Sequence, residues 1–476
     1  MMVVASIHWP VAVAIFIILF DIYWFFRVAT LSLYLMFTFR QMKQNMAVNW
    51  LEKVKEIKGW NDIYHLIILP MVDEPYEIVQ ETFEELKNTN YPKDKFIVVL
   101  AQEERASADN AETGKRIERE YGDLFHKFII STHPHNIPGE TIGKGSNQAY
   151  AAKAVKRDVI DKEGLDYSKI MTSVFDVDTQ IYPEYFGVLT YSFLTEEDPQ
   201  HASYQPIPFF NNNIFQTPAF ARVIALSATY YQMMQQARPE NMVTFSSHSV
   251  PFKALADINF WHVNKVSEDS RIFWQLFIEN HGNWRTVPLA YPVSMDANVA
   301  PSFWQTIKNV YKQQRRWAWG SENIAYMVTN FIKDKKMKLY KKLYWAFHTI
   351  DSFWSWSCAS LMIFALGWMP LLLGGEEFNT SLLSFNLPRV TMQIMSLASL
   401  GIALSAILGV ILLPPKPDWF KTRHYFLYLI QWILLPVTMI VLGSFPAIDA
   451  QTRLMLGGKY RLDKFWVTPK MREFKR

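Results

Sequence analysis

Residues 170–178 read IMTSVFDVD, the clearest local indication of the architecture of this chain. Its first six residues are mostly apolar or β-branched, which is typical of a buried strand. The run then ends in Asp176 and Asp178, which stand two positions apart and therefore point to the same side of an extended chain. A strand that ends in two acids predicts an α/β sheet with functional groups at the carboxyl ends of its strands.

The residues before this stretch alternate between strand-like and helix-like patterns. Apolar, β-rich runs predict three earlier strands, and the segments that follow each of them predict three helices. Such alternation predicts a mostly parallel sheet that helices cover on both faces. The strands are expected at 65–69, 96–100, 128–130 and 170–175, and the helices at 77–87, 109–121 and 146–159.

The composition of the 476-residue chain averages apolar ends and a polar middle, with 50% hydrophobic and 19% charged residues. The net charge is only +4, which argues against a nucleic-acid partner because such proteins usually carry a basic excess. The chain has a single cysteine, Cys358, which excludes a disulfide or a zinc–cysteine site within one chain.

Four apolar stretches are long enough to cross a membrane, since about 20 helical residues span a core of about 30 Å. Arg40 and Lys43 follow the first stretch, and the positive-inside rule then places the N-terminus outside and the polar middle in the cytoplasm. We expect an integral protein of a bacterial-type inner or plasma membrane, in contact with membrane lipids. The stretches are 9–34, 349–373, 390–413 and 425–445.

The basic C-terminal tail conflicts with this count of crossings. Three C-terminal crossings would place the tail outside, although it is rich in lysine and arginine. Either Pro436 makes the last segment re-entrant or the number of crossings differs. The expected division is a transmembrane anchor (1–40), an amphipathic interfacial helix (41–61), a cytoplasmic catalytic α/β domain (62–300), interfacial helices (301–342), about three transmembrane helices (343–446) and a basic tail (447–476).

Acids follow three of the predicted strands. Asp73 follows the first strand, Glu103 the second, and Asp176 and Asp178 the fourth. We expect a shared site, because ligands bind open α/β sheets at the carboxyl ends of the strands. Two carboxylates on one side can hold Mg²⁺ or Mn²⁺, which prefer oxygen ligands and bind substrate phosphates. The alternative is a set of ordinary solvated acids.

Two further motifs begin predicted helices. Lys144 lies in the sequence Gly-Lys-Gly-Ser-Asn at 143–147, where exposed N–H groups and a lysine favour an anion. A plain loop with a serine cap is the alternative. Glu268 and Asp269 precede an apolar helical run, where they provide either a general base for an acceptor hydroxyl or acids favoured by the helix dipole.

The tetrad Gln314-Arg315-Arg316-Trp317 lies in a predicted helix shortly before the C-terminal apolar stretches. The planar fork of arginine suits the oxygens of a diphosphate. The flat face of tryptophan offers a surface on which a sugar ring can stack. The alternative is a basic, aromatic helix that anchors at the membrane headgroups.

In combination and in this order, these motifs resemble those of the membrane-integrated family 2 glycosyltransferases, which include cellulose, chitin and hyaluronan synthases and ceramide glucosyltransferase. The resemblance covers about residues 63–323. It implies a GT-A domain inserted between transmembrane helices. It also implies inverting transfer from a nucleotide sugar, usually a UDP-sugar, to a growing saccharide or polysaccharide at the inner membrane face.

The resemblance also implies a role for each motif. Asp269 would be the catalytic base, and Asp178 would ligate Mg²⁺ or Mn²⁺. The family often has an aspartate after the second strand, which contacts the uracil of the donor. This chain has Glu103 there, whose side chain is one bond longer and would reach the same uracil. The nucleotide sugar would contact Asp73, Glu103, Lys144, Asp176, Arg315 and Arg316, and the acceptor would contact Trp317, Glu268 and Gln314.

Two other functions fit the same sequence. Four crossings are fewer than polymer synthases tend to have, so transfer of one sugar to a lipid acceptor is the first alternative. The second is an inactive nucleotide-binding scaffold. The joint presence of Asp176, Asp178 and Asp269 argues against it, because a scaffold has no need of a base and a metal ligand together.

Overall fold

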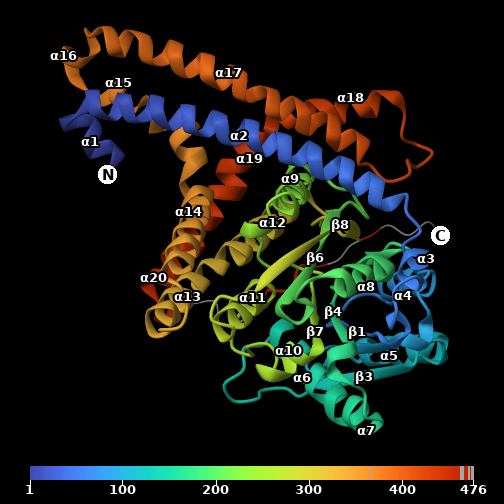
Figure 1. Ribbon diagram of the computed structural model, residues 1–476. Helices are drawn as coiled ribbons and strands as arrows, with labels where there is room; N and C mark the ends of the chain where they lie inside the picture. Colours follow the sequence, from blue (N-terminus) through green and yellow to red (C-terminus); the bar gives the residue numbers. More distant parts are fainter. Residues whose placement is uncertain (365, 461–465, 470–471, 473–476) are drawn as a thin grey trace.

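A mixed eight-stranded sheet in the order β3-β2-β1-β4-β7-β6-β8-β5 forms the centre of the molecule (Figure 1). The computed structural model describes residues 1–364, 366–460, 466–469 and 472. The strands are β1 (Tyr64–Pro70), β2 (Phe96–Glu103), β3 (Lys127–His133), β4 (Ile170–Val174), β5 (Gln180–Ile181), β6 (Ala202–Phe210), β7 (Ser249–Pro251) and β8 (Arg285–Met295).

The four predicted strands are confirmed, and they form one parallel block of the sheet. β1 pairs in parallel with β2 and with β4, and β2 pairs in parallel with β3. β7 is antiparallel to both β4 and β6, which makes the whole sheet mixed. β6 and β8 were not predicted, because each contains two prolines, residues that are depleted in strands. Their parallel pairing is irregular between Gln205 and Ile207, on either side of Pro206.

Helices cover both faces of the sheet because successive residues of a strand point to opposite sides. Ile67 of β1 belongs to a core that includes α4, α5 and α8, whereas its neighbour Leu66 belongs to a core that includes α6, α10 and α11. These helices are α4 (Tyr76–Lys87), α5 (Ala108–Tyr121), α8 (Tyr185–Thr195), α6 (Lys144–Val155), α10 (Phe252–Asp257) and α11 (Glu268–Glu279).

The remaining helices lie before, between and after the strands in the sequence. Short helices are α1 (Met2–His8), α3 (Trp50–Lys55), α7 (Asp161–Glu163), α15 (Met369–Leu373), α16 (Gly375–Asn379), α18 (Thr422–Ile430) and α19 (Leu435–Met439). Longer ones are α2 (Pro10–Met46), α9 (Ala219–Gln236), α12 (Phe303–Ala318), α13 (Glu322–Lys333), α14 (Leu339–Phe364), α17 (Leu382–Ile411) and α20 (Phe445–Leu456).

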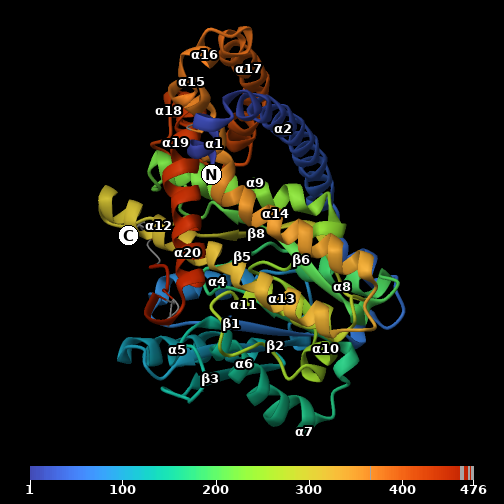
Figure 2. The ribbon, with the colours of Figure 1, turned by 90° about the vertical axis from the view of Figure 1, so that its left-hand side faces the viewer.

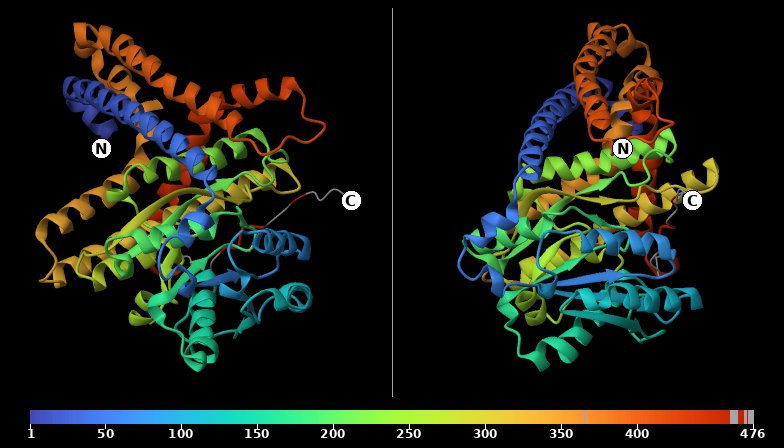
Figure 3. Two further views of the ribbon diagram at one scale, coloured as in Figure 1. Left: turned by 45° about the vertical axis from the view of Figure 1, so that its right-hand side comes forward. Right: turned by 90° about the vertical axis from the view of Figure 1, so that its right-hand side faces the viewer.

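Three helical segments among the described residues are long and apolar enough to cross a membrane, by length and composition: Pro10–Met46, Leu382–Ile411 and Thr422–Leu456. A fourth is possible if Leu339–Phe364 and Leu366–Leu373, bent by 49° relative to each other, form one span. Each of the four predicted apolar stretches overlaps one of these segments. α2 and α17 run side by side on one side of the sheet domain (Figures 1 and 3).

The first apolar helix is longer than the sequence pattern suggested. α2 continues to Met46, because no glycine or proline interrupts residues 11–46. Residues 41–46, expected to begin an interfacial helix, are therefore the last turns of α2, and α3 follows as a separate helix of 6 residues.

α9 connects the sheet to the apolar helices (Figure 2). Val223 and Leu226 of α9 share a core with Ile207 of β6, Met42 of α2 and Leu408 of α17. The β6 region of the sheet therefore lies next to the candidate membrane spans.

Candidate active site

The start of α6 places Lys144 between two aspartates. Gly143 has φ 152°, in the region that favours glycine, and the helix begins at the next residue. The Lys144 ammonium then lies 2.9 Å from Oδ1 of Asp176 and 3.1 Å from Oδ1 of Asp269. The Asn147 side chain donates to the carbonyl of Ala101 at 2.7 Å, which fixes α6 against the end of β2. Three of the predicted site residues therefore meet at one point.

A close approach of two helix starts creates this meeting point. A Cβ on Gly145 of α6 would lie 3.0 Å from Cβ of Glu268, the first residue of α11. Glycine at this position thus lets α11 bring Asp269 within reach of Lys144. The serine-cap alternative for this motif does not apply, because Ser146 Oγ donates to the carbonyl of Gly143 at 2.9 Å and lies inside the helix.

The electrostatics of this cluster are those of a buried, charge-paired site. Burial would lower the pKa of Lys144, but Asp176 and Asp269 outweigh it and raise that pKa. Burial raises the pKa of the Glu268 carboxyl to about 8, helped by Asp269 and opposed by Lys144 and Arg316. Burial lowers the pKa of Arg316, and the neighbouring acids act in the opposite direction by raising it. Near pH 7 the cluster therefore holds two cations, two aspartates and a protonated Glu268.

Two residues of the β6–β7 region complete the cluster: Ser246, which the sequence patterns did not identify, and His248, which the sequence suggested only as a residue lining the acceptor pocket. Ser246 Oγ donates to Oδ2 of Asp176 at 3.1 Å. His248 is fully buried, with Nδ1 2.9 Å from the carbonyl of Phe245 and 3.7 Å from Oδ1 of Asp269. Burial lowers the pKa of His248, so this imidazole is neutral beside Asp269.

Arg315 and Arg316 point to different parts of the molecule. Arg316 faces the acid cluster, where Glu268, Asp176 and Asp269 act on its charge. Arg315 instead donates to Oδ2 of Asp449 on α20 at 2.9 Å. Consecutive residues of a helix are about 100° apart around its axis, so the pair divides between the site and a candidate span.

Trp317 lies on the side of the site that faces the apolar helices. Its ring centroid is 5.8 Å from that of Phe210 and 5.9 Å from that of Phe245. Leu413, two residues after the end of α17, packs against the same cluster. Gln314, one turn earlier in α12, is buried.

Asp73 and Glu103 lie at the ends of β1 and β2, apart from the lysine-centred cluster in their contacts. Asp73 accepts from the backbone N–H of Ser107 at 2.8 Å. Glu103 forms an ion pair with Arg105, and both line a cavity of about 250 Å³ that also includes His133 and Ser146. This cavity opens beside the start of α6.

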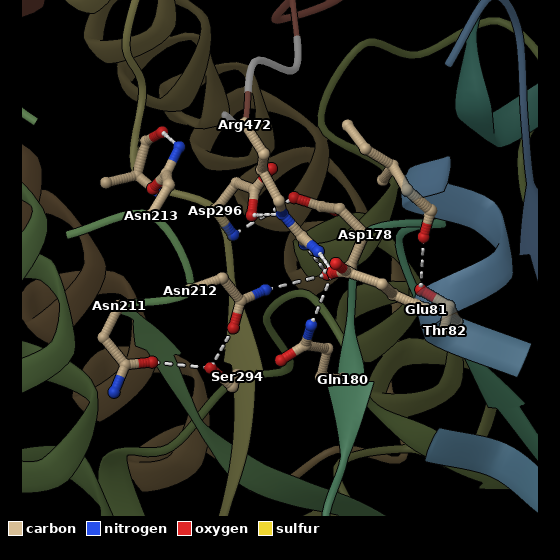
Figure 4. A network of polar contacts seen from close by, with 12 residues as sticks. Glu81, Thr82, Asp178, Gln180, Asn211, Asn212, Asn213, Ser294, Asp296 and Arg472 are labelled. Carbon is tan, nitrogen blue, oxygen red and sulfur yellow. Dashed lines mark hydrogen bonds and ion pairs between the residues drawn. The ribbon is translucent and has the colours of Figure 1, made fainter. Parts of the chain in front are cut away.

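Asp178 lies in a second polar network rather than at Lys144 (Figure 4). It is fully buried, and its Oδ2 accepts from the backbone N–H of Asp296 at 3.1 Å. Asp296 in turn pairs with Arg472 of the C-terminal tail, Nε to Oδ1, at 2.7 Å. Asp296 and Arg472 were missed, although Asp296 directly follows β8 as Asp176 nearly follows β4.

Asp178 and Asp296 offer the oxygen ligands that a hard divalent cation binds, but the described residues do not form a complete metal-binding cage. Among the described residues, no group of three or more histidine, cysteine or acidic side chains is arranged to hold a metal. Asp178 and Asp296 nevertheless accommodate a positive charge, that of Arg472. Oxygen ligands from one or two carboxylates, completed by phosphates and water, are what Mg²⁺ and Mn²⁺ require.

Comparison with solved structures finds glycosyltransferases whose similarity to this chain is low. The mannosyltransferase PcManGT from Pyrobaculum calidifontis, in complex with GDP-Man and Mn²⁺, is 13% identical, with a TM-score of 0.41 over 86% of this chain and 99% of that one. S. aureus TarS 1–349 with UDP-GlcNAc is 12% identical, with a TM-score of 0.38 over 84% of this chain and 93% of that one. Glucosyl-3-phosphoglycerate synthase from Mycobacterium tuberculosis, with Mg²⁺ and UDP, is 12% identical, with a TM-score of 0.32 over 53% of this chain and 77% of that one. The similarity is too low for the nucleotides and metal ions bound in those structures to be assigned to this chain.

No curated protein sequence matches this chain significantly. The model of a protein family, described as glycosyl transferase family group 2, matches residues 173–442, more than half of the chain. The matched range includes Asp176, Asp269 and Trp317. The predicted fold class, a GT-A domain with apolar helices before and after it, and the predicted enzyme class are both confirmed. The chain belongs to glycosyl transferase family group 2.

Proposed function

We propose that this glycosyltransferase transfers a sugar from a nucleotide-sugar donor, with a UDP-sugar expected, to a growing saccharide at the inner face of a membrane. Transfer occurs in one displacement with inversion at the sugar carbon. The observation that carries the proposal is the buried ammonium of Lys144, 2.9 Å from Asp176 and 3.1 Å from Asp269, with Arg316 facing the same acids. Two buried cations beside two aspartates provide both an anion site and a base.

The bond changes follow from this arrangement. The acceptor hydroxyl loses its proton to the carboxylate of Asp269 as its oxygen forms a bond to the sugar carbon. The bond from that carbon to the diphosphate breaks, and the electron pair leaves with the nucleoside diphosphate. Lys144 and Arg316 stabilise the charge that develops on the departing oxygens, which is usually the largest single contribution in such a site.

Asp178 would hold Mg²⁺ or Mn²⁺, and Asp296 lies close enough to share it through the network of Figure 4. When bound, the divalent cation supplies Lewis-acid stabilisation of the leaving diphosphate. Asp73 and Glu103 bind the nucleoside in this proposal, which is supported by their positions after β1 and at the end of β2 and by the place of Glu103 in the lining of the cavity beside α6.

The acceptor approaches from the side of the apolar helices. Trp317 lies there with Phe210 and Phe245, and Leu413 at the end of α17 packs against the same group. A sugar ring of the acceptor stacks on Trp317 in this proposal, with Gln314 and Glu268 nearby. The sheet domain lies on the cytoplasmic side, where nucleotide sugars are supplied.

The direct test is release of nucleoside diphosphate by the full chain purified in detergent, with Mn²⁺ or Mg²⁺ and a panel of donors. UDP-sugars form the main panel. GDP-mannose tests whether the enzyme requires uracil as the nucleobase of the donor, and an excess of EDTA tests whether it requires the divalent cation. We expect release with one UDP-sugar, loss of release with EDTA, and a ladder of products. Binding of UDP without transfer from any donor would instead support the scaffold alternative.

Transfer of a single sugar to a lipid remains the second candidate function. It is favoured by the small number of candidate spans, three or four among the described residues. Three or four spans are too few to enclose a channel for a polymer, whereas a lipid acceptor reaches Trp317 from the bilayer and needs no channel. The same assay separates the two functions, because lipid transfer gives one extractable glycolipid in place of a ladder.

A further inference from the structure

A lysine-rich turn connects α13 to α14, the first of the C-terminal apolar helices. Residues 331–344 read FIKDKKMKLYKKLY, and they contain six lysines against one acid, Asp334. The turn lies beside α11 (Figure 1). Positive charge is therefore concentrated where α14 begins. Four of these lysines precede α14 and are exposed, and together they are called the basic turn: Lys333, Lys335, Lys336 and Lys338.

The acid of this segment shapes the turn and does not pair with its lysines. Asp334 Oδ1 accepts from the backbone N–H of Lys336 at 2.7 Å and from that of Met337 at 3.1 Å, and its Oδ2 lies 3.0 Å from Nδ1 of His281. Met337 is buried in the core that includes α11, which fixes the turn to the sheet domain. Within the part of the chain that the structure describes, none of the six lysines forms an ion pair. Their mutual repulsion is therefore not offset by an acid in that part of the chain.

α14 has an apolar row on the side turned away from the sheet domain. This row consists of Leu339, Leu343 and Phe347, which are 68%, 62% and 76% exposed and whose spacing of four places them on one face of the helix. Trp345 instead packs against the domain, with its ring centroid 5.3 Å from that of Phe273 on α11. The apolar row begins next to the basic turn and lies on the bent fourth candidate span. An exposed apolar row of this kind marks a surface that an apolar partner covers.

The basic turn and the apolar row together favour one kind of partner. An acidic phospholipid offers a headgroup phosphate to the lysines and acyl chains to the apolar row. Clusters of about 4–8 basic residues beside a membrane span attract such lipids in the cytoplasmic leaflet. A soluble acidic protein would pair with the lysines but would leave the apolar row next to them in water.

We propose that the basic turn binds the headgroup phosphates of acidic phospholipids and that the apolar row contacts their acyl chains. This surface lies just beyond the C-terminal end of α11, the helix whose first turn carries Asp269. Bound acidic lipids thereby anchor the helix of the proposed base at the membrane. The inference rests on the membrane side assigned in the proposed function, but it requires no particular donor or acceptor.

The first experiment measures lipid binding to the full chain in a neutral detergent by native mass spectrometry. The two ligands are phosphatidylglycerol and phosphatidylcholine with the same acyl chains. We expect wild type to bind phosphatidylglycerol at least about tenfold more tightly, since each lysine near an acidic lipid contributes about fivefold to the binding constant. Replacement of all four lysines of the basic turn by glutamine should remove this preference without changing the melting temperature.

The matched control changes the net charge by the same amount elsewhere in the sheet domain and should keep the preference of wild type. It replaces four other exposed lysines: Lys115→Gln, Lys127→Gln, Lys153→Gln and Lys162→Gln. Equal affinity of wild type for the two lipids would overturn the proposal. An equal loss of preference in the two fourfold variants would also overturn it, because net charge alone would then decide binding.

A competition separates the lipid from its phosphate. Glycerol 3-phosphate offers a similar phosphate without acyl chains, and at the same concentration it should not displace phosphatidylglycerol. Displacement by this soluble compound would overturn the lipid as the ligand of the surface.

A second measurement tests the apolar row without changing a lysine. A nitroxide attached at Leu343→Cys, in a chain with Cys358→Ser, is studied in vesicles of phosphatidylglycerol and phosphatidylcholine. Oxygen dissolved in the bilayer should relax this nitroxide more than a water-soluble nickel complex does, and a nitroxide at Lys115→Cys on α5 should show the opposite order. Stronger relaxation by the nickel complex at position 343 would overturn contact between the apolar row and lipid.

Neither measurement uses a nucleotide sugar, so the two proposals fail separately. Absence of transfer with every donor would overturn the proposed function, while a preference for phosphatidylglycerol that depends on the basic turn would still support the lipid surface. Normal transfer by a chain with no such preference would overturn the lipid surface alone.

Discussion

The ammonium of Lys144 donates to both carboxylate oxygens of Asp269, at 3.1 and 3.2 Å. The same nitrogen lies 2.9 Å from Asp176, so one buried cation joins the start of α11 to the segment after β4. The pairing fixes the orientation of the Asp269 side chain. It also keeps positive charge at the place where a diphosphate would bind.

Removal of this cation should damage both binding and stability. Lys144→Met should raise the donor KM by at least about tenfold and lower the free energy of unfolding by about 1–3 kcal/mol, since two aspartates lose a charged partner. Lys153→Met is the control, because Lys153 is exposed on the same helix. The checks are donor titration and thermal unfolding. Equal effects of the two substitutions would contradict the bridging role.

The close approach at Gly145 predicts sensitivity to one added methyl group. Gly145→Ala would place a Cβ 3.0 Å from Glu268 Cβ, so α11 should shift and transfer should fall by about 100-fold, the scale expected for a misplacement of about 1 Å. Gly122→Ala is the control, since the nearest atom to its Cβ would be 3.6 Å away. The measurement is kcat/KM for each variant. Full activity of Gly145→Ala would mean that the two helix starts tolerate separation.

The raised pKa of Glu268 predicts an alkaline limit. Its pKa is about 8 in the folded chain, against the ordinary 4.5 of a glutamate, because burial disfavours the charged carboxylate, so the folded state holds the proton more tightly. The associated stability is full below pH 4.5 and is lost as pH rises to about 8. Above pH 8 an added negative charge beside Asp269 should also weaken donor binding by about tenfold. Glu268→Gln should remove both pH dependences, measured as melting temperature and donor KM from pH 5 to 9. Identical pH profiles for the two proteins would contradict this assignment.

The two arginines of α12 should separate by phenotype. Arg316→Ala should lower kcat/KM by about 100-fold, because it removes a buried donor that faces the developing charge. Arg315→Ala should act mainly on stability, since its partner is Asp449 on α20. Asp449→Asn should reproduce the Arg315→Ala effect on melting temperature. Loss of donor binding in Arg315→Ala without loss of stability would reverse the assignment.

The parallel half of the fold was predictable from sequence because its signals are local. β1, β2 and β4 are apolar runs with helical segments between them, and the acids that follow them are visible as strand ends. β6 and β8 were hidden by their prolines, because proline is depleted in strands. The extent of α2 was underestimated because a membrane-length estimate stops at about 20 residues while a helix stops only at a breaker.

The sequence predicted which residues belong to the candidate site better than it predicted the contacts between them. Lys144, Asp176 and Asp269 were chosen from separate motifs, and the structure brings them together. The split between Arg315 and Arg316, and the link from Asp296 to Arg472, depend on contacts between residues more than 100 positions apart. Such contacts leave no local pattern.

The role of Asp269 as the base is tested by comparing transfer and nucleotide binding in Asp269→Asn. Diphosphate release with the best donor should fall by about 100- to 10,000-fold, the scale of a lost general base. The Kd for UDP with Mn²⁺, by calorimetry, should stay within about threefold of wild type, because Lys144 and Arg316 remain. Glu279→Gln, exposed at the other end of α11, should match wild type in both. Sustained transfer by Asp269→Asn, or loss of UDP binding along with transfer, would contradict the assignment of Asp269 as the base.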